Sequence, residues 1–456
     1  MSLNFLSAIR IDSTIAPYII GVVGLFAFFA FRLRQRSYEV VKDNTTTAKS
    51  PFSNEFPPSR RAFANLPAHN EKDSWRKSSS DLRTVTGFTK SDVAAIGRFP
   101  DYAVLSGVPH PKPAPNFDIH KALFRPFRPF RWAYHQTMAF GKIDPNYWIE
   151  LEQNYFERMA ERQKLLEEQG PKVLDAGEGD LADMVCRELM EMVVQNICIR
   201  YPQYFTLKNK RYLENKLLST TTDTETVSPL MVLFNNVPED FAIALRHDDG
   251  YYYLRCGITC SAIAWNISTM KNKSLIEIHG RVGDYKEKMA KSMDRFFCKV
   301  PTDQAIQRGS WSIEDWKMLF LEEENYAARS RFVDKPGKLT AEDCFLRVDW
   351  QTLRRLPLSG AMVFNFKAVF TPLGELREEP YVPALLHKQL KEGKEILVSW
   401  RTHSDARRVV LDGLESWARE QVSASVVPVD WEVSTLAEAP FYPGWKERWI
   451  ARQGFE

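Results

Sequence analysis

Apolar residues recur every three to four positions in several segments, which is the spacing of an amphipathic helix. One apolar stripe runs from Trp148 to Leu166, after an Asp144-Pro145 start and before a Gly170-Pro171 stop. Together these signals predict a helix that begins at Pro145. Other predicted helices cover residues 180–200, 282–297, 383–394 and 407–424.

Elsewhere the period falls to two, which is typical of a strand. Met362, Phe364, Phe366, Ala368 and Phe370 alternate with smaller or polar residues. Residues 251–265 are rich in aromatic and β-favouring types and predict one or two further strands. Because strands and helices follow each other without a regular βαβ rhythm, the sequence predicts an α+β fold.

The N-terminal region contains one long apolar run. No charged residue occurs between Ser13 and Phe31, a length that matches a hydrocarbon core of about 30 Å. A buried core helix is the alternative, but no later segment is comparably long and apolar. Residues 13–31 are therefore predicted to be a transmembrane anchor.

Charges beside the apolar run predict its orientation. Arg32, Arg34 and Arg36 follow it, which argues against a cleaved signal peptide and places the C-terminal side in the cytosol by the positive-inside rule. We expect a single-pass protein of the endoplasmic reticulum membrane with its body facing the cytosol. Residues 32–100 are polar and rich in Ser and Pro, so we expect a disordered tether followed by a folded body over 101–456.

Composition excludes several classes of protein. Of 456 residues, 44% are hydrophobic, and 61 Lys and Arg nearly balance 58 Asp and Glu. A net charge of +3 argues against nucleic-acid binding, and six cysteines are too few for a disulfide-rich scaffold. The Cys256–Cys260 spacing has no second metal-ligand pair, so core packing is expected for both.

The sequence also lacks the common nucleotide and catalytic signatures. No G-x-G-x-x-G, P-loop, G-x-S-x-G or H-E-x-x-H pattern occurs. If the protein performs redox chemistry, its electrons must therefore come from a separate component.

Two of the eight histidines lie in settings that suit a buried site. His135 lies among aromatic residues and arginines, and His279 lies where an apolar segment meets a predicted helix. A neutral imidazole at such a junction can bind a metal or a haem iron. The alternative for His279 is a structural ring that bonds a backbone carbonyl.

Residues 347–373 combine polar and apolar features. Arg347, Asp349 and Gln351 alternate along one side of an extended segment, and Arg354 and Arg355 follow. This pattern predicts either a lined pocket with an anion clamp or a surface ladder of ion pairs.

These residues also carry a likeness to a known family. The chain resembles the haem-dependent oxidative N-demethylase-like family, in a fungal, membrane-anchored form, over roughly residues 100–420. The matching segments are Phe127-Arg128-Pro129-Phe130-Arg131-Trp132, Arg200-Tyr201-Pro202, Ile278-His279, Gln307-Arg308-Gly309-Ser310-Trp311 and Leu346 to Pro357.

The resemblance implies a PAS-like α+β body with additional helices that encloses haem b. The implied reaction is O2-dependent oxidation of a small secondary amine to a primary amine and formaldehyde, with electrons from a separate flavin and iron–sulfur reductase. It implies His279 as the iron ligand, Arg308 and Trp311 as further haem-binding residues, and Arg347, Gln351 and Arg354 as catalytic residues.

One segment departs from the family pattern. The family motif is I-H-x-P-V-P, whereas this chain has Arg281-Val282-Gly283 after His279 and Gly280. Proline fixes φ and glycine frees it, so the loop that carries His279 is predicted to be less pre-organised. A haem-binding or ligand-sensing module without turnover and a membrane-tethered structural protein remain the alternatives.

Overall fold

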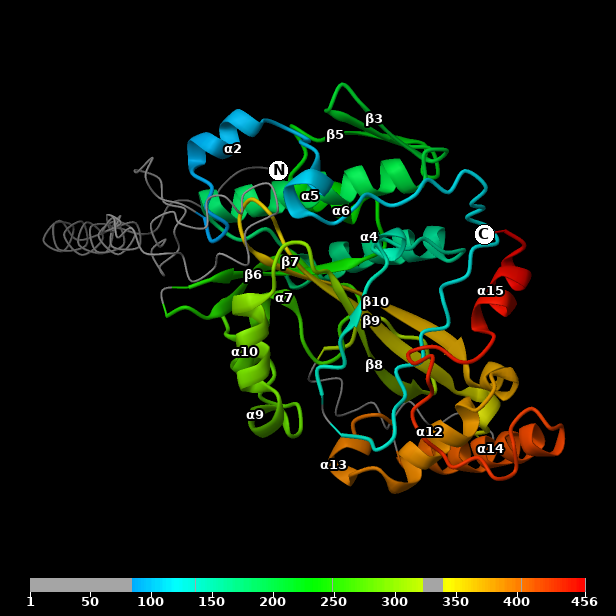
Figure 1. The fold of residues 1–456 in the computed structure, drawn as a ribbon. Helices are drawn as coiled ribbons and strands as arrows, with labels where there is room; N and C mark the ends of the chain where they lie inside the picture. The colour runs from blue at the N-terminus through cyan, green and yellow to red at the C-terminus, as the bar shows by residue number, and fades with distance from the viewer. Residues whose placement is uncertain (1–83, 136, 248, 323–338, 403, 456) are drawn as a thin grey trace, which may run out of the picture.

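A seven-stranded antiparallel sheet forms the centre of the protein in the computed structural model, which describes residues 84–135, 137–247, 249–322, 339–402 and 404–455 (Figure 1). Its strand order is β1-β8-β9-β10-β6-β7-β2, and a separate small sheet has the order β3-β4-β5. The strands are β1 (Gly141–Lys142), β2 (Leu174–Asp175), β3 (Phe205–Lys208), β4 (Tyr212–Asn215), β5 (Thr220–Asp223), β6 (Asp240–Arg246), β7 (Tyr252–Ile258), β8 (Ile306–Glu314), β9 (Phe345–Arg355) and β10 (Met362–Pro372). All described strand pairs are antiparallel, so the predicted α+β class is confirmed.

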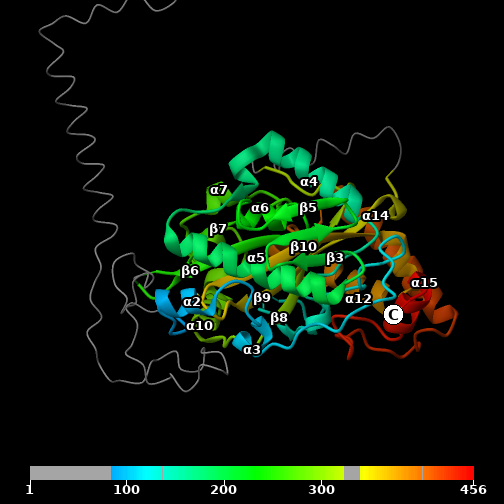
Figure 2. The same cartoon turned by 90° about the horizontal axis from the view of Figure 1, so that it is seen from above.

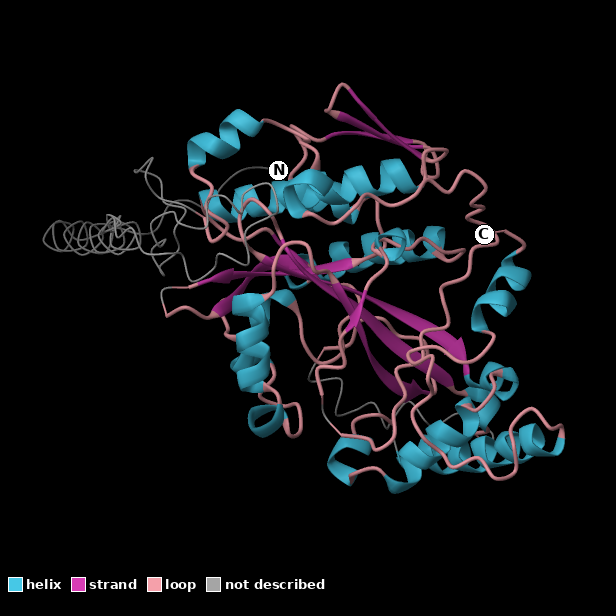
Figure 3. Cartoon of the chain, viewed as in Figure 1, coloured by secondary structure: helices cyan, strands magenta, loops and turns pink. Residues whose placement is uncertain are grey.

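Helices cover both faces of the large sheet (Figures 1 and 3). α4, α5 and α6 lie over one face, and α9 and α10 lie on the other side (Figure 1). Seen from above, α5 crosses in front of the sheet (Figure 2). The helices are α2 (Lys90–Ile96), α3 (Tyr102–Ser106), α4 (Tyr155–Gln169), α5 (Asp180–Arg200), α6 (Pro229–Phe234), α7 (Ile267–Met270), α8 (Leu275–Ile278), α9 (Tyr285–Lys288), α10 (Ala290–Lys299), α12 (Val382–Glu392), α13 (Glu395–Val398), α14 (Ser404–Ser423) and α15 (Trp445–Gln453), with short 3-10 turns η3 (Pro145–Tyr147), η4 (Gly170–Lys172), η6 (Ala341–Asp343) and η7 (Leu373–Glu378).

Several sequence predictions match these elements. α5 has the predicted bounds, while β7, β10, α12 and α14 lie within or close to the predicted ranges. The helix predicted over 282–297 is divided into α9 and α10 at Met289.

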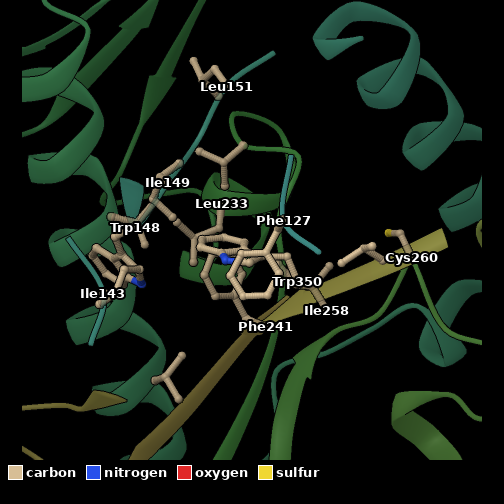
Figure 4. Close-up of a cluster of buried hydrophobic side chains, with 14 of the residues drawn as sticks. Phe127, Ile143, Trp148, Ile149, Leu151, Leu233, Phe241, Ile258, Cys260 and Trp350 are labelled. Atoms are coloured by element: carbon tan, nitrogen blue, oxygen red, sulfur yellow. The ribbon is translucent and has the colours of Figure 1, made fainter. Parts of the chain in front are cut away.

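The main core lies between the first face of the sheet and α4–α6. Trp350 of β9 is fully buried at its centre, with Phe241, Ile258 and Leu233 in the same cluster (Figure 4). Because side chains alternate along a strand, burying Trp350 turns its neighbour Gln351 toward the second face.

The helix predicted to begin at Pro145 begins ten residues later. Asp144 does cap a turn, since its side chain accepts from the Asn146 N–H, but this turn is only the 3-10 turn η3. The following N–H groups donate to distant partners instead of helical carbonyls: that of Glu150 to Glu239, that of Leu151 to the Tyr201 hydroxyl. Because these tertiary hydrogen bonds take the place of helical ones, residues 148–154 do not form the helix that their apolar spacing predicts.

The folded body begins before residue 101, so the predicted tether boundary is wrong. The hydroxyls of Thr84 and Thr86 both donate to the Leu358 carbonyl, at 2.6 and 2.7 Å, in the turn between β9 and β10. Gly360 of that turn has φ of +75°, and a Cβ there would lie 2.5 Å from the Cβ of Val85. The turn therefore requires glycine at this position, both because φ is positive and because the chain at Val85 comes so close.

The same turn is held from α5 by a buried carboxylate. Glu188 accepts from the N–H groups of Leu358 and Ser359, at 2.5 and 3.0 Å. Burial raises the pKa of Glu188 from 4.5 to about 7, although these two hydrogen bonds oppose the shift.

This pKa shift predicts a pH-dependent stability. A carboxyl group with a raised pKa in the folded state binds its proton more tightly there than in the unfolded chain. Its stabilising effect is present below pH 4.5 and is lost as the pH rises to about 7. Between pH 4.5 and about 7, the free energy of unfolding measured with urea should therefore fall by about 3 kcal/mol less in Glu188→Gln than in the wild type. An equal pH dependence in both proteins would contradict this assignment. Glu167→Gln, at an exposed position of α4, is the control.

The predicted anchor, residues 13–31, and the tether up to residue 83 lie outside the described residues. Within the described ranges, no helix combines the length and apolar character that crossing a bilayer requires.

Candidate functional site

The second face of the sheet brings polar and aromatic side chains into adjacent rows. The register pairs Arg308 of β8 with Gln351 of β9, and Gln351 with Phe366 of β10. Directly paired residues of antiparallel strands point to the same face, so these three form one row. The next residues on that face are Ser310, Asp349 and Ala368, followed by Ser312, Arg347 and Phe370.

His279 lies at the C-terminal end of α8, beside this face. Its Nδ1 is 2.8 Å from the Leu275 carbonyl oxygen, and its ring stacks on Tyr285 at 4.5 Å between centroids. A carbonyl can only accept, so Nδ1 carries the proton and Nε2 of the neutral ring has the lone pair. Burial, and to a lesser extent the charge of Arg308, lowers the pKa of His279, which favours this neutral form.

The loop after His279 is ordered without the prolines of the family motif. The Val282 N–H donates to the His279 carbonyl, and the Tyr285 N–H donates to the Val282 carbonyl. Gly283 has no positive φ; a Cβ there would lie 3.3 Å from Ile396 of α13. Arg281 is exposed, so its charge points away from the apolar face. The loop is thus hydrogen-bonded without the prolines, and the prediction that it is less pre-organised than the family's loop stays a prediction.

Arg131 and Arg401 lie close to Arg308, whose charge in turn acts on His279. Burial, and after it the charges of Arg401 and Arg131, lowers the pKa of Arg308 to about 10. Arg401 donates to the Ser310 hydroxyl and the Trp311 carbonyl, and Arg131 donates to the Thr137 hydroxyl. Arg308 Nε is buried and has no partner among the described residues. No carboxylate pairs with any of the three in the described ranges, so the cluster can bind an anion.

An aromatic surface lies beside the histidine and the arginines. Phe364 and Phe366 of β10 have ring centroids 5.2 Å apart, and Trp265 lies 5.6 Å from Phe366. Ile278, the neighbour of His279, packs against the same group. The second face therefore carries a group of mutually tilted aromatic rings, of which Phe366 is buried, together with a histidine and a cationic cluster.

The family comparison agrees with this combination. The sequence model of the family described as haem-dependent oxidative N-demethylase, alpha subunit-like, matches residues 139–411, which is more than half of the chain. The chain belongs to this family. Membership in the N-demethylase family suggests a haem cofactor and an oxidative N-demethylase-like activity.

The residues of the second face fit the haem on which this family depends. A haem requires an axial ligand, an apolar surface for its ring and cations for its two propionates. His279 Nε2 can provide the ligand. The Trp265–Phe366 surface, whose partly exposed rings are Trp265 and Phe364, is apolar, and the arginine cluster can provide the cations. A metal site made of protein ligands alone is a different matter: the described residues contain no group of three or more His, Cys, Asp or Glu suited to it.

Of the predicted site residues, Arg308 and Gln351 lie on the face of the sheet that His279 borders. Arg347 lies on the same face but has another role. Arg308 and Gln351 are cross-strand neighbours, and the side chain of Gln351 has no hydrogen-bond partner in the described part of the chain. Arg347 points to the same face but donates to Asp349 and to three backbone carbonyls, those of Ser261, Met318 and Leu319. These bonds give Arg347 a structural role.

The other two predicted site residues are not brought to His279. Trp311 lies on the first face and packs edge-on against Phe130, with ring centroids 5.3 Å apart. Arg354 also points to the first face, where its guanidinium lies over the ring of Trp148. Both differ in strand parity from Arg308 and Gln351, so their side chains leave the sheet on the opposite face, although the Trp311 ring lies 5.4 Å from the Arg401 guanidinium carbon.

Sequence reasoning missed Arg401. It lies in no motif, and it reaches the site because its carbonyl accepts from the Ile313 N–H of β8, at 2.6 Å. No local signal could have revealed this contact. Cys256 and Cys260 are buried and free, as expected for core packing.

Proposed function

We propose that the second face of the sheet binds haem b, with His279 as the axial ligand through Nε2. The supporting observation is the hydrogen bond from His279 Nδ1 to the Leu275 carbonyl, which fixes the tautomer that leaves Nε2 able to bind iron. The arginine cluster of Arg131, Arg308 and Arg401 would bind the propionates. The Trp265–Phe366 surface would contact the porphyrin ring and exclude water.

We propose oxidative N-demethylation of a small secondary amine as the reaction. In net terms, R–NH–CH3, O2, two electrons and two protons give R–NH2, formaldehyde and water. When bound, the haem supplies O2 activation, which no side chain can provide. The free amide of Gln351 would orient the polar end of the substrate, and the aromatic residues would hold its methyl group.

The electrons would come from a separate reductase with flavin and iron–sulfur centres. This proposal rests on the lack of nucleotide-binding motifs in the sequence. We further propose that the antiparallel sheet is a PAS-like core.

We also propose that residues 13–31 anchor the protein and that its body faces the cytosol at the endoplasmic reticulum. The apolar character of residues 13–31 and the three arginines that follow them support the anchor.

Absorption spectroscopy and product analysis test the proposal in order. The full-length chain, reconstituted with haem, should give a Soret band. With O2, an electron donor and a panel of N-methylamines, it should release formaldehyde and the primary amine in equal amounts. A Soret band without formaldehyde from any amine would favour a haem sensor, and a colourless protein would exclude both haem functions.

The arginine cluster gives a separate prediction. Arg308→Gln removes one cation from the propionate site but leaves His279 intact. Haem affinity, measured by Soret titration, should fall by about tenfold or more, because a hydrogen bond to a charged group contributes about 1.5–3 kcal/mol. The Soret position should stay the same, and Arg452→Gln on exposed α15 should bind haem normally. An unchanged haem affinity in Arg308→Gln would argue against this orientation of the cofactor.

A further inference from the structure

A small cavity lies on the first face of the sheet, where Arg354 points. It measures about 30 Å³ and lies between α3, α5, the Val108–Pro111 loop and the end of β9. Trp148 and Ile143, seen side by side in Figure 4, form part of its wall. The sheet itself separates this cavity from His279 on the second face.

Two residues that line the cavity each carry a buried donor without a partner among the described residues. Arg354 is 5% exposed, makes no hydrogen bond or ion pair with any described residue, and its Nε is fully buried. Its guanidinium carbon lies 4.2 Å from the centroid of Trp148. Trp148 is 4% exposed, and its Nε1–H likewise has no acceptor. A buried donor without an acceptor costs about 1–3 kcal/mol, and a charged one more, so two in one cavity point to an occupant.

The remaining polar groups of the cavity add to this pattern. Asn196 of α5 is buried and its amide has no partner in the described ranges. Gln195, by contrast, is already used, because it accepts from the Tyr102 N–H and donates to the Pro100 carbonyl. His110 is bonded to Asp101, and both oxygens of Glu188 are taken by backbone N–H groups. The groups left over are therefore the cationic guanidinium of Arg354, the indole N–H of Trp148 and the amide of Asn196, all of which can donate.

The cavity is held in shape by hydrogen bonds around it. The Lys112 N–H donates to Asn146, Arg200 donates to the Lys112 carbonyl, and the Ile143 N–H donates to the Ala305 carbonyl. Its volume is about that of two water-sized groups, which matches a carboxylate group. The partly exposed residues Val108 to His110 line it, so a ligand can reach it from solvent.

From these contacts we infer that the cavity is a binding site for a small monocarboxylate. One carboxylate oxygen accepts from Arg354, and the Trp148 indole N–H and the Asn196 amide supply the other donors. The site is independent of the haem proposal, because it lies on the opposite face of the sheet and shares no residue with it.

Acetate tests this inference, with acetamide as its neutral counterpart. Saturation-transfer NMR on the acetate methyl group, with the full-length protein at constant ionic strength, should show one saturable site. Acetamide should bind at least tenfold more weakly. Arg354→Gln should weaken acetate binding by more than tenfold, and Trp148→Phe, which keeps the stacked ring, by about fivefold.

Two controls separate this site from others. His279→Ala should bind acetate as the wild type does, which excludes binding at a haem iron, and so should Arg452→Gln. If Arg354→Gln does not fold, Trp148→Phe decides. Absence of saturable acetate binding, equal binding of acetamide, or unchanged acetate binding in Trp148→Phe overturns the inference.

Discussion

Replacing His279 by alanine should leave the protein folded but unable to hold haem. The side chain is partly buried, and within the described residues it makes one hydrogen bond, with the Leu275 carbonyl, and one ring stack, with Tyr285, so few specific interactions are lost with it. It would, however, remove the proposed axial ligand. Removal of groups that merely orient metal ligands already costs about 10–100-fold in metal affinity, so loss of the ligand should cost more than about 100-fold. Soret absorbance after haem reconstitution measures this loss.

A matched histidine and a chemical rescue make the test specific. His120→Ala, which removes an exposed ring stacked on Phe156, should keep normal haem binding. Free imidazole added to His279→Ala should restore part of the Soret band, since it can occupy the space of the lost ring. A normal Soret band in His279→Ala would refute the ligand assignment.

The second large effect concerns a buried ion pair between α4 and β6. Arg162 Nη1 lies 2.6 Å from Asp240 Oδ1, and the two side chains are 1% and 0% exposed. Asp240 also accepts from the N–H groups of Cys260 and Ser261. Arg162 donates further to the carbonyls of Pro238 and Glu239, so both ions are embedded in hydrogen bonds.

Arg162→Met should therefore lower the free energy of unfolding by about 3–5 kcal/mol, because it leaves the Asp240 carboxylate buried without its counter-ion. Urea unfolding measures the loss. Arg452→Met breaks an exposed pair with Glu375 and should cost less than about 1 kcal/mol. Equal losses in the two variants would mean that burial does not govern the effect. The double variant Arg162→Met/Asp240→Leu should recover part of the loss, since no uncompensated charge remains.

The period-two pattern assigns the residues of β9 and β10 to the two faces of the sheet. The alternation through Phe364 and Phe366 predicted β10, and Arg347, Asp349 and Gln351 do share one face. The same alternation requires Arg354, three positions after Gln351, to lie on the opposite face. Family likeness grouped these residues, whereas strand geometry separates them.

Other features depended on contacts between segments far apart in sequence. Glu150 and Leu151 follow a helical stripe, yet their N–H groups donate to residues 89 and 50 positions away. Thr84 falls in the predicted polar tether because the acceptor that ties its hydroxyl to the sheet, the Leu358 carbonyl, is 274 residues distant. Periodicity reports which side of an element is apolar; it does not report which distant group will meet its backbone.

The attachment of Thr84 and Thr86 to the β9–β10 turn has a mechanical consequence. Tension on the chain that precedes residue 84 would be transmitted to the tip of the hairpin that carries Gln351 and Phe366. The strands of this hairpin are paired over eleven positions, so the load would act on the stiffest part of the sheet. Thr84 and Thr86 therefore couple the start of the described chain to the centre of the molecule rather than to its edge.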